Sequence, residues 1–219
     1  VYVFGGAIDT PGYGDFIGQT IGALRAADSA VIVINAHSGI EVNTPRVFQE
    51  AGGGGIGRLI VINKMDEHNI DFPALMERIR DTFGNQCVLV NVPVGDGAGF
   101  KGVISTLGHA GNTAGALIDP EEIHTRLIES IVEADEVLMT KYFEGEEPSQ
   151  EQLDSLIEHA VAKGTLVPII CCSAKTGVGL TELLDMLVEC APPPTAVERN
   201  GKKDGAEVEI KPDPTGPLV

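Results

Sequence analysis

The chain has 219 residues, enough to bury a substantial core in one domain or in one domain and part of another. Its 43% hydrophobic content includes no run of 18 apolar residues, so we expect no transmembrane helix and no membrane partner. A formal net charge of −17 argues against sequence-specific DNA binding or any other binding that relies on neutralising phosphates, but it leaves open docking onto a ribonucleoprotein or a basic protein.

The cysteines and histidines form no metal-binding pattern. Cys171 and Cys172 are adjacent within an apolar stretch, whereas Cys87 and Cys190 stand alone, and the five histidines do not cluster. We interpret the cysteines as small buried hydrophobic residues, predict no zinc site, and expect a reducing cytoplasmic location.

The first third of the chain alternates between strand and helix patterns. In chain order we predict a strand over residues 1–8, a helix over 16–27, a strand over 30–34, a helix over 43–51 that a run of four glycines ends, and a strand over 59–62. The continuous apolar run at 30–34 predicts a strand buried on both faces. Such alternation predicts an α/β fold with a parallel sheet, in which ligands bind beyond the carboxyl ends of the strands. Because the first strand begins at once, we expect the protein to continue upstream of Val1.

The pattern changes after residue 87. Short apolar runs broken by glycine predict small strands up to about residue 115, as part of an inserted subdomain. One helix is predicted along the apolar repeat from Ile123 to Leu138, and a second from the capping box that starts at Ser149 to about Gly164. A buried strand over 167–172 and a helix over 181–189 follow, and we interpret residues 195–219 as a loose linker to a further domain.

The first chemically suggestive motif is Asp9-Thr10-Pro11-Gly12, directly after the first predicted strand. In a GTPase, an aspartate at this point reaches Mg²⁺ through water, and the glycine lets a backbone N–H approach the γ-phosphate. The motif alone is more typical of an ordinary surface turn, because Asp and Gly occur in any such turn.

The second motif, Asn63-Lys64-Met65-Asp66, is more specific. The Asp66 carboxylate can accept hydrogen bonds from N1–H and the exocyclic amine of guanine, a donor pair that adenine lacks. The aliphatic stem of Lys64 can lie along the base, and Asn63 can tie neighbouring loops together. The alternative is a charged turn that merely ends a strand.

The third motif, Ser173-Ala174-Lys175, again follows a buried strand. Its expected contribution is the backbone N–H of Ala174, which is suited to the guanine O6. The order of the three motifs, each at the end of a strand, favours a GTP-binding domain over a chance occurrence. The glycine-rich stretch at 52–59 resembles a phosphate loop, but Arg58 replaces the lysine, Leu59 replaces the hydroxyl residue, and the stretch precedes a strand instead of opening a helix.

These motifs resemble those of elongation factor G and its relatives. Residues 9–16, residues 59–66 and the distinctive stretch Glu133–Gly145 are similar to that family, and the similarity runs from Val1 to about Pro194. The resemblance implies a P-loop NTPase-type parallel sheet with helices on both faces and an inserted α+β subdomain. It also implies GTP or GDP and Mg²⁺ as ligands, and ribosomal RNA and the ribosomal stalk protein as partners.

The resemblance divides the chain into a partial GTP-binding domain (1–87), the insertion (88–160), the final strand and helix (161–194) and a linker (195–219). The phosphate loop and first switch are absent from this sequence, so this piece alone is expected to be inactive. The family has histidine where this chain has Tyr13, and that histidine orients the attacking water. Tyr13 and the neighbouring Gly12, which senses the γ-phosphate, are therefore the candidate catalytic residues. The Tyr13-Gly14 pair resembles the elongation factor G-like branch. A ribosome-dependent GTPase acting in translocation or recycling, a ribosomal protection factor and a non-hydrolysing scaffold all stay open.

Overall fold

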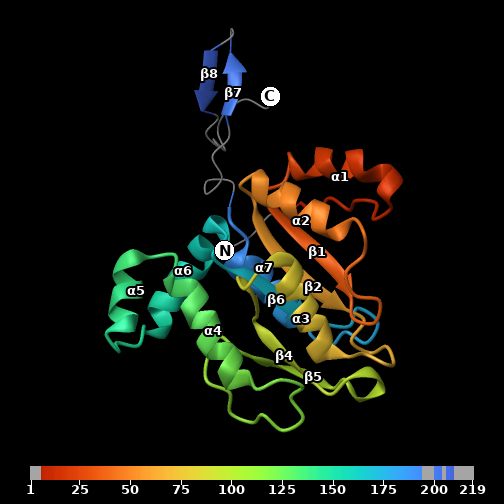
Figure 1. Cartoon of the computed structure of the whole chain (residues 1–219), viewed down its shortest axis with the longest axis vertical. Helices are drawn as coiled ribbons and strands as arrows, with labels where there is room; N and C mark the ends of the chain where they lie inside the picture. The colour runs from red at the N-terminus through yellow and green to blue at the C-terminus, as the bar shows by residue number, and fades with distance from the viewer. Residues whose placement is uncertain (1–5, 194–199, 204–205, 210–219) are drawn as a thin grey trace.

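A parallel sheet of four strands forms the centre of the molecule (Figure 1). The computed structural model describes residues 6–193, 200–203 and 206–209. The sheet order is β1-β2-β6-β3, with β1 at Ser29–Asn35, β2 at Gly57–Asn63, β3 at Cys87–Leu89 and β6 at Val167–Cys171. Asn35 is in register with Asn63, and Ile62 with Cys171, so these strands finish at the same edge of the sheet. The predicted α/β class is confirmed.

Helices cover both faces of this sheet, as predicted. Successive residues of a strand point to opposite faces. Neighbouring residues of β2 therefore show which helix lies on each face. A Cβ added to Gly57 would meet Val161, which belongs to the helix Gln150–Lys163. On the other face, the Arg58 guanidinium lies 4.4 Å from the centre of the ring of Phe48, which belongs to the helix Thr44–Gly53. The rings of Phe48 and Phe83 are 4.5 Å apart. One face therefore carries α2 (Thr44–Gly53) and α3 (Phe72–Phe83), and the other carries α6 (Gln150–Lys163) with its neighbour α7 (Leu180–Cys190).

Strand β1 departs from expectation because only one of its faces is buried. Ile32 and Ile34 lie in the core, but Val31 and Val33 are 42% and 62% exposed. The apolar run was predicted to be covered on both sides, and this is wrong. The reason is positional, since β1 is the last strand in the described sheet order, α2 packs on its buried side, and α6 contacts β2 instead.

The N-terminal elements are shorter than predicted. A 3-10 turn at Gly14–Phe16 leads into α1 (Ile17–Leu24), which packs against α2 and ends before the expected residue 27. Of the strand expected over 1–8, residues 6–8 are not in a strand and residues 1–5 lie outside the described part.

The glycine run after residue 51 does not stop α2 at once. The helix continues through Gly53, and the turn toward β2 follows at Gly55, whose φ is +70°. A Cβ on Gly52 would lie 2.6 Å from a guanidinium nitrogen of Arg58. The stretch that resembles a phosphate loop is therefore a helix-to-strand connection. The Arg58 guanidinium occupies the space that a side chain at position 52 would fill.

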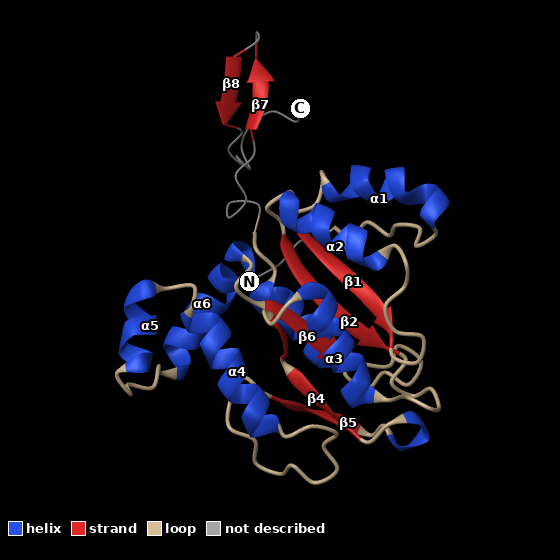
Figure 2. Cartoon of the chain, viewed as in Figure 1, coloured by secondary structure: helices blue, strands red, loops and turns tan. Residues whose placement is uncertain are grey.

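The chain leaves the sheet after β3 and returns at β6. The expected boundary at residue 88 falls inside β3, so the excursion begins at the antiparallel pair β4 (Asn91–Val94) and β5 (Gly102–Ser105). A 3-10 turn at Gly97–Gly99 lies between these strands, and α4 (Pro120–Val132) and α5 (Glu136–Phe143) follow (Figure 2).

One predicted helix is in fact two. The Asp135 carboxylate accepts the N–H groups of Val137 and Leu138, each at 2.9 Å, and so caps a new helix within the apolar repeat. The capping box at Ser149 and the helix end near Gly164 are confirmed, and Gly164 has a left-handed backbone with φ of +77°.

The tail contains an antiparallel pair where a loose linker was expected, β7 (Asn200–Lys203) with β8 (Ala206–Glu209). Residues 194–199, 204–205 and 210–219 lie outside the described part. Within the described ranges, no helix is long and apolar enough to cross a membrane.

Candidate functional site

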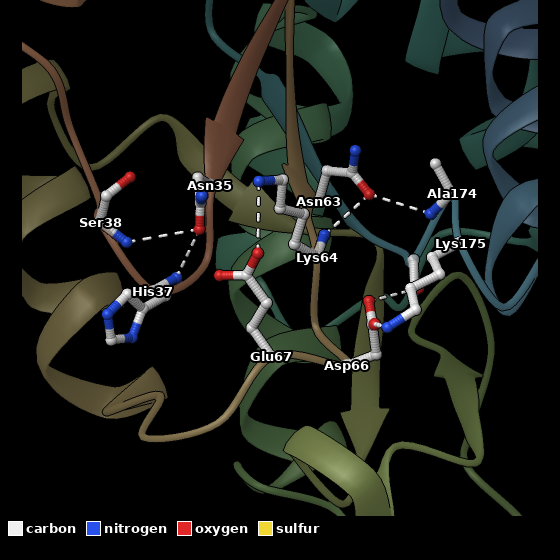
Figure 3. Close-up of polar contacts among 10 residues, drawn as sticks. Asn35, His37, Ser38, Asn63, Lys64, Asp66, Glu67, Ala174 and Lys175 are labelled. Atoms are coloured by element: carbon white, nitrogen blue, oxygen red, sulfur yellow. Dashed lines mark hydrogen bonds and ion pairs between the residues drawn. The ribbon is translucent and has the colours of Figure 1, made fainter.

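Two of the three predicted motifs meet at the carboxyl edge of the sheet. The Ser173 hydroxyl donates to Asp66 Oδ1 at 2.6 Å, and Lys175 Nζ lies 3.6 Å from Asp66 Oδ2 (Figure 3). Asp66 follows β2 and Ser173 follows β6, and these strands are adjacent in the sheet. The fold thus brings together side chains that are 107 residues apart in the sequence.

Asp66 is suited to act as a charged acceptor. Its side chain is 11% exposed, and the hydrogen bond from Ser173 is the main cause that holds the pKa of this carboxyl below its ordinary value. The Lys175 ammonium lowers the pKa further. An ionised carboxylate offers about four acceptor positions. Acceptor capacity is therefore left for a ligand that presents two N–H donors side by side.

Asn63 ties the two loops together. Its Oδ1 accepts the backbone N–H of Lys64 at 2.7 Å and that of Ala174 at 2.9 Å. The tying role predicted for Asn63 matches this geometry. The Ala174 N–H, expected to face a ligand oxygen, is directed to Asn63 in this structure.

Lys64 has an unusual backbone. Its φ is +66°, a left-handed backbone conformation that residues other than glycine rarely adopt. Its ammonium lies 3.2 Å from Glu67 Oε1, so both ends of its aliphatic stem are held (Figure 3).

The loop after β6 is tightly built around Ser173, which is fully buried. The Ser173 hydroxyl accepts the N–H of Thr176 at 3.1 Å while donating to Asp66. Gly179 has a φ of +81°, and a Cβ there would lie 2.5 Å from the Cys171 carbonyl oxygen. The close packing of the Gly179 backbone against Cys171 therefore helps to hold the loop that carries Ser173.

The remaining predicted residues lie apart from this network. Asp9, Gly12 and Tyr13 are exposed, Tyr13 to 80%, and no hydrogen bond or ion pair within the described ranges joins them to the loops of Asp66 or Ser173. The described residues also contain no group of three or more His, Cys, Asp or Glu that could hold a metal. Asp9 could contribute one carboxylate to Mg²⁺, an ion that keeps several waters and takes its other ligands from substrate phosphates.

Sequence reasoning did not single out Asn35 or Glu67. The side chain of Asn35 accepts the N–H groups of His37 and Ser38 at 2.8 and 3.3 Å, at the same sheet edge as Asn63 (Figure 3). The position of Asn35 directly after an apolar run is the signal that could have identified it. Glu67 has no such signal, because its role depends on the turn that Lys64 makes.

Comparison with known proteins places this arrangement in a family. The family described as the elongation factor Tu GTP binding domain matches residues 6–193, and the chain belongs to it. The chain is also similar to a protein from Thermus thermophilus of known crystal structure, with 33% sequence identity and a TM-score of 0.73. That similarity covers 85% of this chain and 30% of the Thermus chain, so this sequence spans less than a third of its structural relative.

Proposed function

We propose that this chain is the guanine-reading part of a translation factor of the elongation factor G type, which hydrolyses GTP on the ribosome. The observation that carries the proposal is the Asp66 carboxylate, oriented by a buried serine at the carboxyl edge of a parallel sheet. Family membership supports guanine nucleotide as the ligand.

The geometry suggests a division of roles around the base. Asp66 accepts N1–H and the exocyclic amine of guanine, and the stem of Lys64 lies along the ring. Asn63 and Ser173 hold the loops, and Lys175 lies beside the carboxylate. Because Ala174 N–H points to Asn63, a contact with the guanine O6 would require this N–H to be shared between the two oxygens.

For the phosphate end we propose that Asp9 reaches Mg²⁺ through water and that Gly12 senses the γ-phosphate. The lysine and hydroxyl residues of a phosphate loop are not found in the 219 residues, so we propose that the complete protein supplies them from a further segment. Tyr13 stands at the position of the water-orienting residue. We propose that hydrolysis is slow or dependent on a partner, because a phenol cannot simply replace an imidazole.

The wider role follows from the family resemblance. We propose translocation or recycling in the cytoplasm as the process, with ribosomal RNA and the stalk protein as partners, the latter meeting the insertion. Protection of the ribosome on the same scaffold is a sibling role.

A second candidate is a non-hydrolysing scaffold that recognises a protein through the insertion. The observation that favours it is Tyr13, which is 80% exposed and stands where the family has its water-orienting histidine. Negligible GTP turnover by the complete protein with ribosomes would support this candidate over the GTPase.

The first test is a titration of fluorescent GDP against fluorescent ADP, on the complete protein and on this chain alone. We expect selective GDP binding by the complete protein and weak binding by the chain, since the base-reading loops are present in both. If neither sample prefers guanine, the proposal is overturned.

A further inference from the structure

The base-reading loop is held from two sides by hydrogen bonds to Met65. This residue lies between Lys64 and Asp66 and is fully buried. The Met65 N–H donates at 3.2 Å to the carbonyl of Cys172, a residue in the loop after β6. The Met65 carbonyl accepts the N–H of Gly97 at 2.9 Å. Fixing the peptide groups on both sides of Met65 fixes the direction in which the Asp66 side chain leaves the backbone.

Gly97 comes from the insertion, in the turn between β4 and β5. It is buried, its φ is +54°, and a Cβ there would lie 3.1 Å from the Glu67 carbonyl oxygen. A residue with a side chain would be strained by the left-handed backbone and crowded against the loop that the turn touches. Glycine is thus required here for close contact between two backbones.

The turn is itself rigid. The N–H of Gly99 donates to the Asp96 carbonyl at 2.8 Å, and the N–H of Phe100 donates to the Gly97 carbonyl at 3.1 Å. The Phe100 side chain is buried in the main hydrophobic core. A turn built in this way can restrain the neighbouring loop, because it does not yield easily itself.

The turn is also connected to the outer part of the insertion. Gly95 N–H donates to the Gly115 carbonyl at 2.9 Å, and Leu117 N–H donates to the Pro93 carbonyl at 3.1 Å. The segment that contains Gly115 and Leu117 runs directly into α4 at Pro120. Backbone hydrogen bonds therefore join the N-terminal end of α4 to the turn and the turn to Met65.

We propose that the β4–β5 turn is a positioning element for guanine recognition, through which the insertion sets how long the nucleotide stays bound. The inference rests on the proposed function, since it assumes that the loop of Asp66 reads the base. Gly97 is a positioning residue, because it acts on Asp66 through the Met65 carbonyl. A protein that binds the insertion and shifts this turn would change nucleotide release without touching the nucleotide.

The test compares Gly97→Ala with Gly99→Ala in the complete protein. Gly99 lies two residues away in the same turn, is exposed, and has open space where a Cβ would be, so its substitution is a matched control. We expect Gly97→Ala to release fluorescent GDP about tenfold faster than the wild type, and Gly99→Ala to release it at the wild-type rate. Gly95→Ala should resemble Gly97→Ala, because a Cβ on Gly95 would collide with the Gly99 carbonyl oxygen.

Amide hydrogen exchange on the wild type gives a readout that does not depend on the variants folding. Since coupling between two sites is reciprocal, GDP should increase the protection of residues 95–101 relative to ADP. A folded Gly97→Ala variant with wild-type GDP release would overturn the inference, and so would unchanged protection of the turn on GDP binding. A wild type that binds GDP no better than ADP would be a different failure, since it would remove the proposed function itself.

Discussion

At the scale of single residues, the two oxygens of Asp66 have different surroundings. Oδ1 accepts the buried Ser173 hydroxyl, while Oδ2 has the exposed Lys175 ammonium nearby at 3.6 Å. The serine thus fixes the rotation of the carboxylate, whereas the second oxygen has an exposed side chain as its neighbour. This asymmetry lets one side chain be both oriented by the protein and available to a ligand.

Asp66→Asn should change base preference and leave the fold intact. The amide oxygen of asparagine can still accept the Ser173 hydroxyl, but its NH₂ group faces the N–H donors of guanine. We expect GDP affinity in the complete protein to fall at least about 100-fold, because two hydrogen bonds to a charged group are lost. Competition between GDP and xanthosine diphosphate measures the change, and an unmoved preference would show that another loop reads the base.

Ser173→Ala should alter the pH dependence of stability. The Ser173 hydrogen bond lowers the pKa of Asp66 from its ordinary value of 3.8, so its stabilisation is present above that value and is lost as the pH falls through the lower, folded-state value. At pH 7 we expect the variant to lose about 1.5–3 kcal/mol in free energy of unfolding. The difference should shrink below pH 3.8.

Urea unfolding at a series of pH values checks this expectation. Ser155→Ala is the control, since that hydroxyl donates to the exposed Gln152 carbonyl, a neutral acceptor. An equal loss at pH 7 and in strong acid would rule out the charged hydrogen bond as the cause.

Tyr13→Phe should affect turnover and not affinity. The phenol is 80% exposed and contributes no described contact to the base-reading loops, so GDP binding should stay within about twofold of wild type, as is usual for surface changes. GTP turnover by the complete protein with ribosomes should change if the hydroxyl positions water. Weaker GDP binding with unchanged turnover would contradict the role that we propose for this side chain.

The residues proposed to read the base could be singled out because their motifs begin where an apolar run ends. Asn63 and Ser173 follow such runs directly, Asp66 lies three residues after Asn63, and the sheet brings their loops together. Gly97 could not be predicted in the same way, since its N–H pairs with a carbonyl 32 residues earlier and no local pattern marks that contact. The direction of the Ala174 N–H was likewise beyond prediction, because it depends on the position of the Asn63 side chain.

At the scale of elements, periodicity predicted the buried strands β2 and β6 and most helices. It missed α3 and assigned β3 to the insertion, and it could not show what covers the strands. The alternating exposure of β1 depends on its place in the sheet order, which the sequence of the strand does not state. The break between α4 and α5 did have a local signal, the capping residue Asp135, but the apolar repeat that continues past it hid the break.

An asparagine replaces strand pairing where the insertion leaves the sheet. The Asn91 side chain is buried, accepts the N–H of Cys171 at 2.8 Å and donates to its carbonyl at 3.2 Å. It supplies partners for the backbone N–H and carbonyl of Cys171, which lies on β6 just beyond the residues that pair with β3. A residue of β4 therefore pairs with the end of the strand that leads to Ser173.

Asn91→Ala should destabilise the protein by about 2–5 kcal/mol, because two buried backbone groups lose their partners. Asn112→Ala is the matched control, since that exposed side chain accepts the N–H of Ala114 at the surface and its loss should cost little. Thermal and urea unfolding of both variants give the comparison. Similar stabilities for the two would mean that the backbone of β6 finds other partners.

At the scale of the whole molecule, the net charge of −17 should oppose compactness by self-repulsion. Raising ionic strength from about 0.01 to about 0.1 M shortens the Debye length from about 30 to about 10 Å. We therefore expect the melting temperature to rise with sodium chloride at pH 7. Near the isoelectric point of about 4.5 the rise should vanish, and its persistence there would point to another effect of the salt.

The separation along the chain of the two loops that meet at Asp66 and Ser173 has a consequence for synthesis. Asp66 and Ser173 are 107 residues apart, and the whole insertion is made between them. During translation, at roughly 5–20 residues per second, about 5–20 seconds pass between the synthesis of the first loop and that of its partner. If these loops read the base as we propose, a nascent chain that already has β1, β2 and the turn of Gly97 would have only half of the pocket, and it would not retain nucleotide until β6 and the loop of Ser173 leave the exit tunnel.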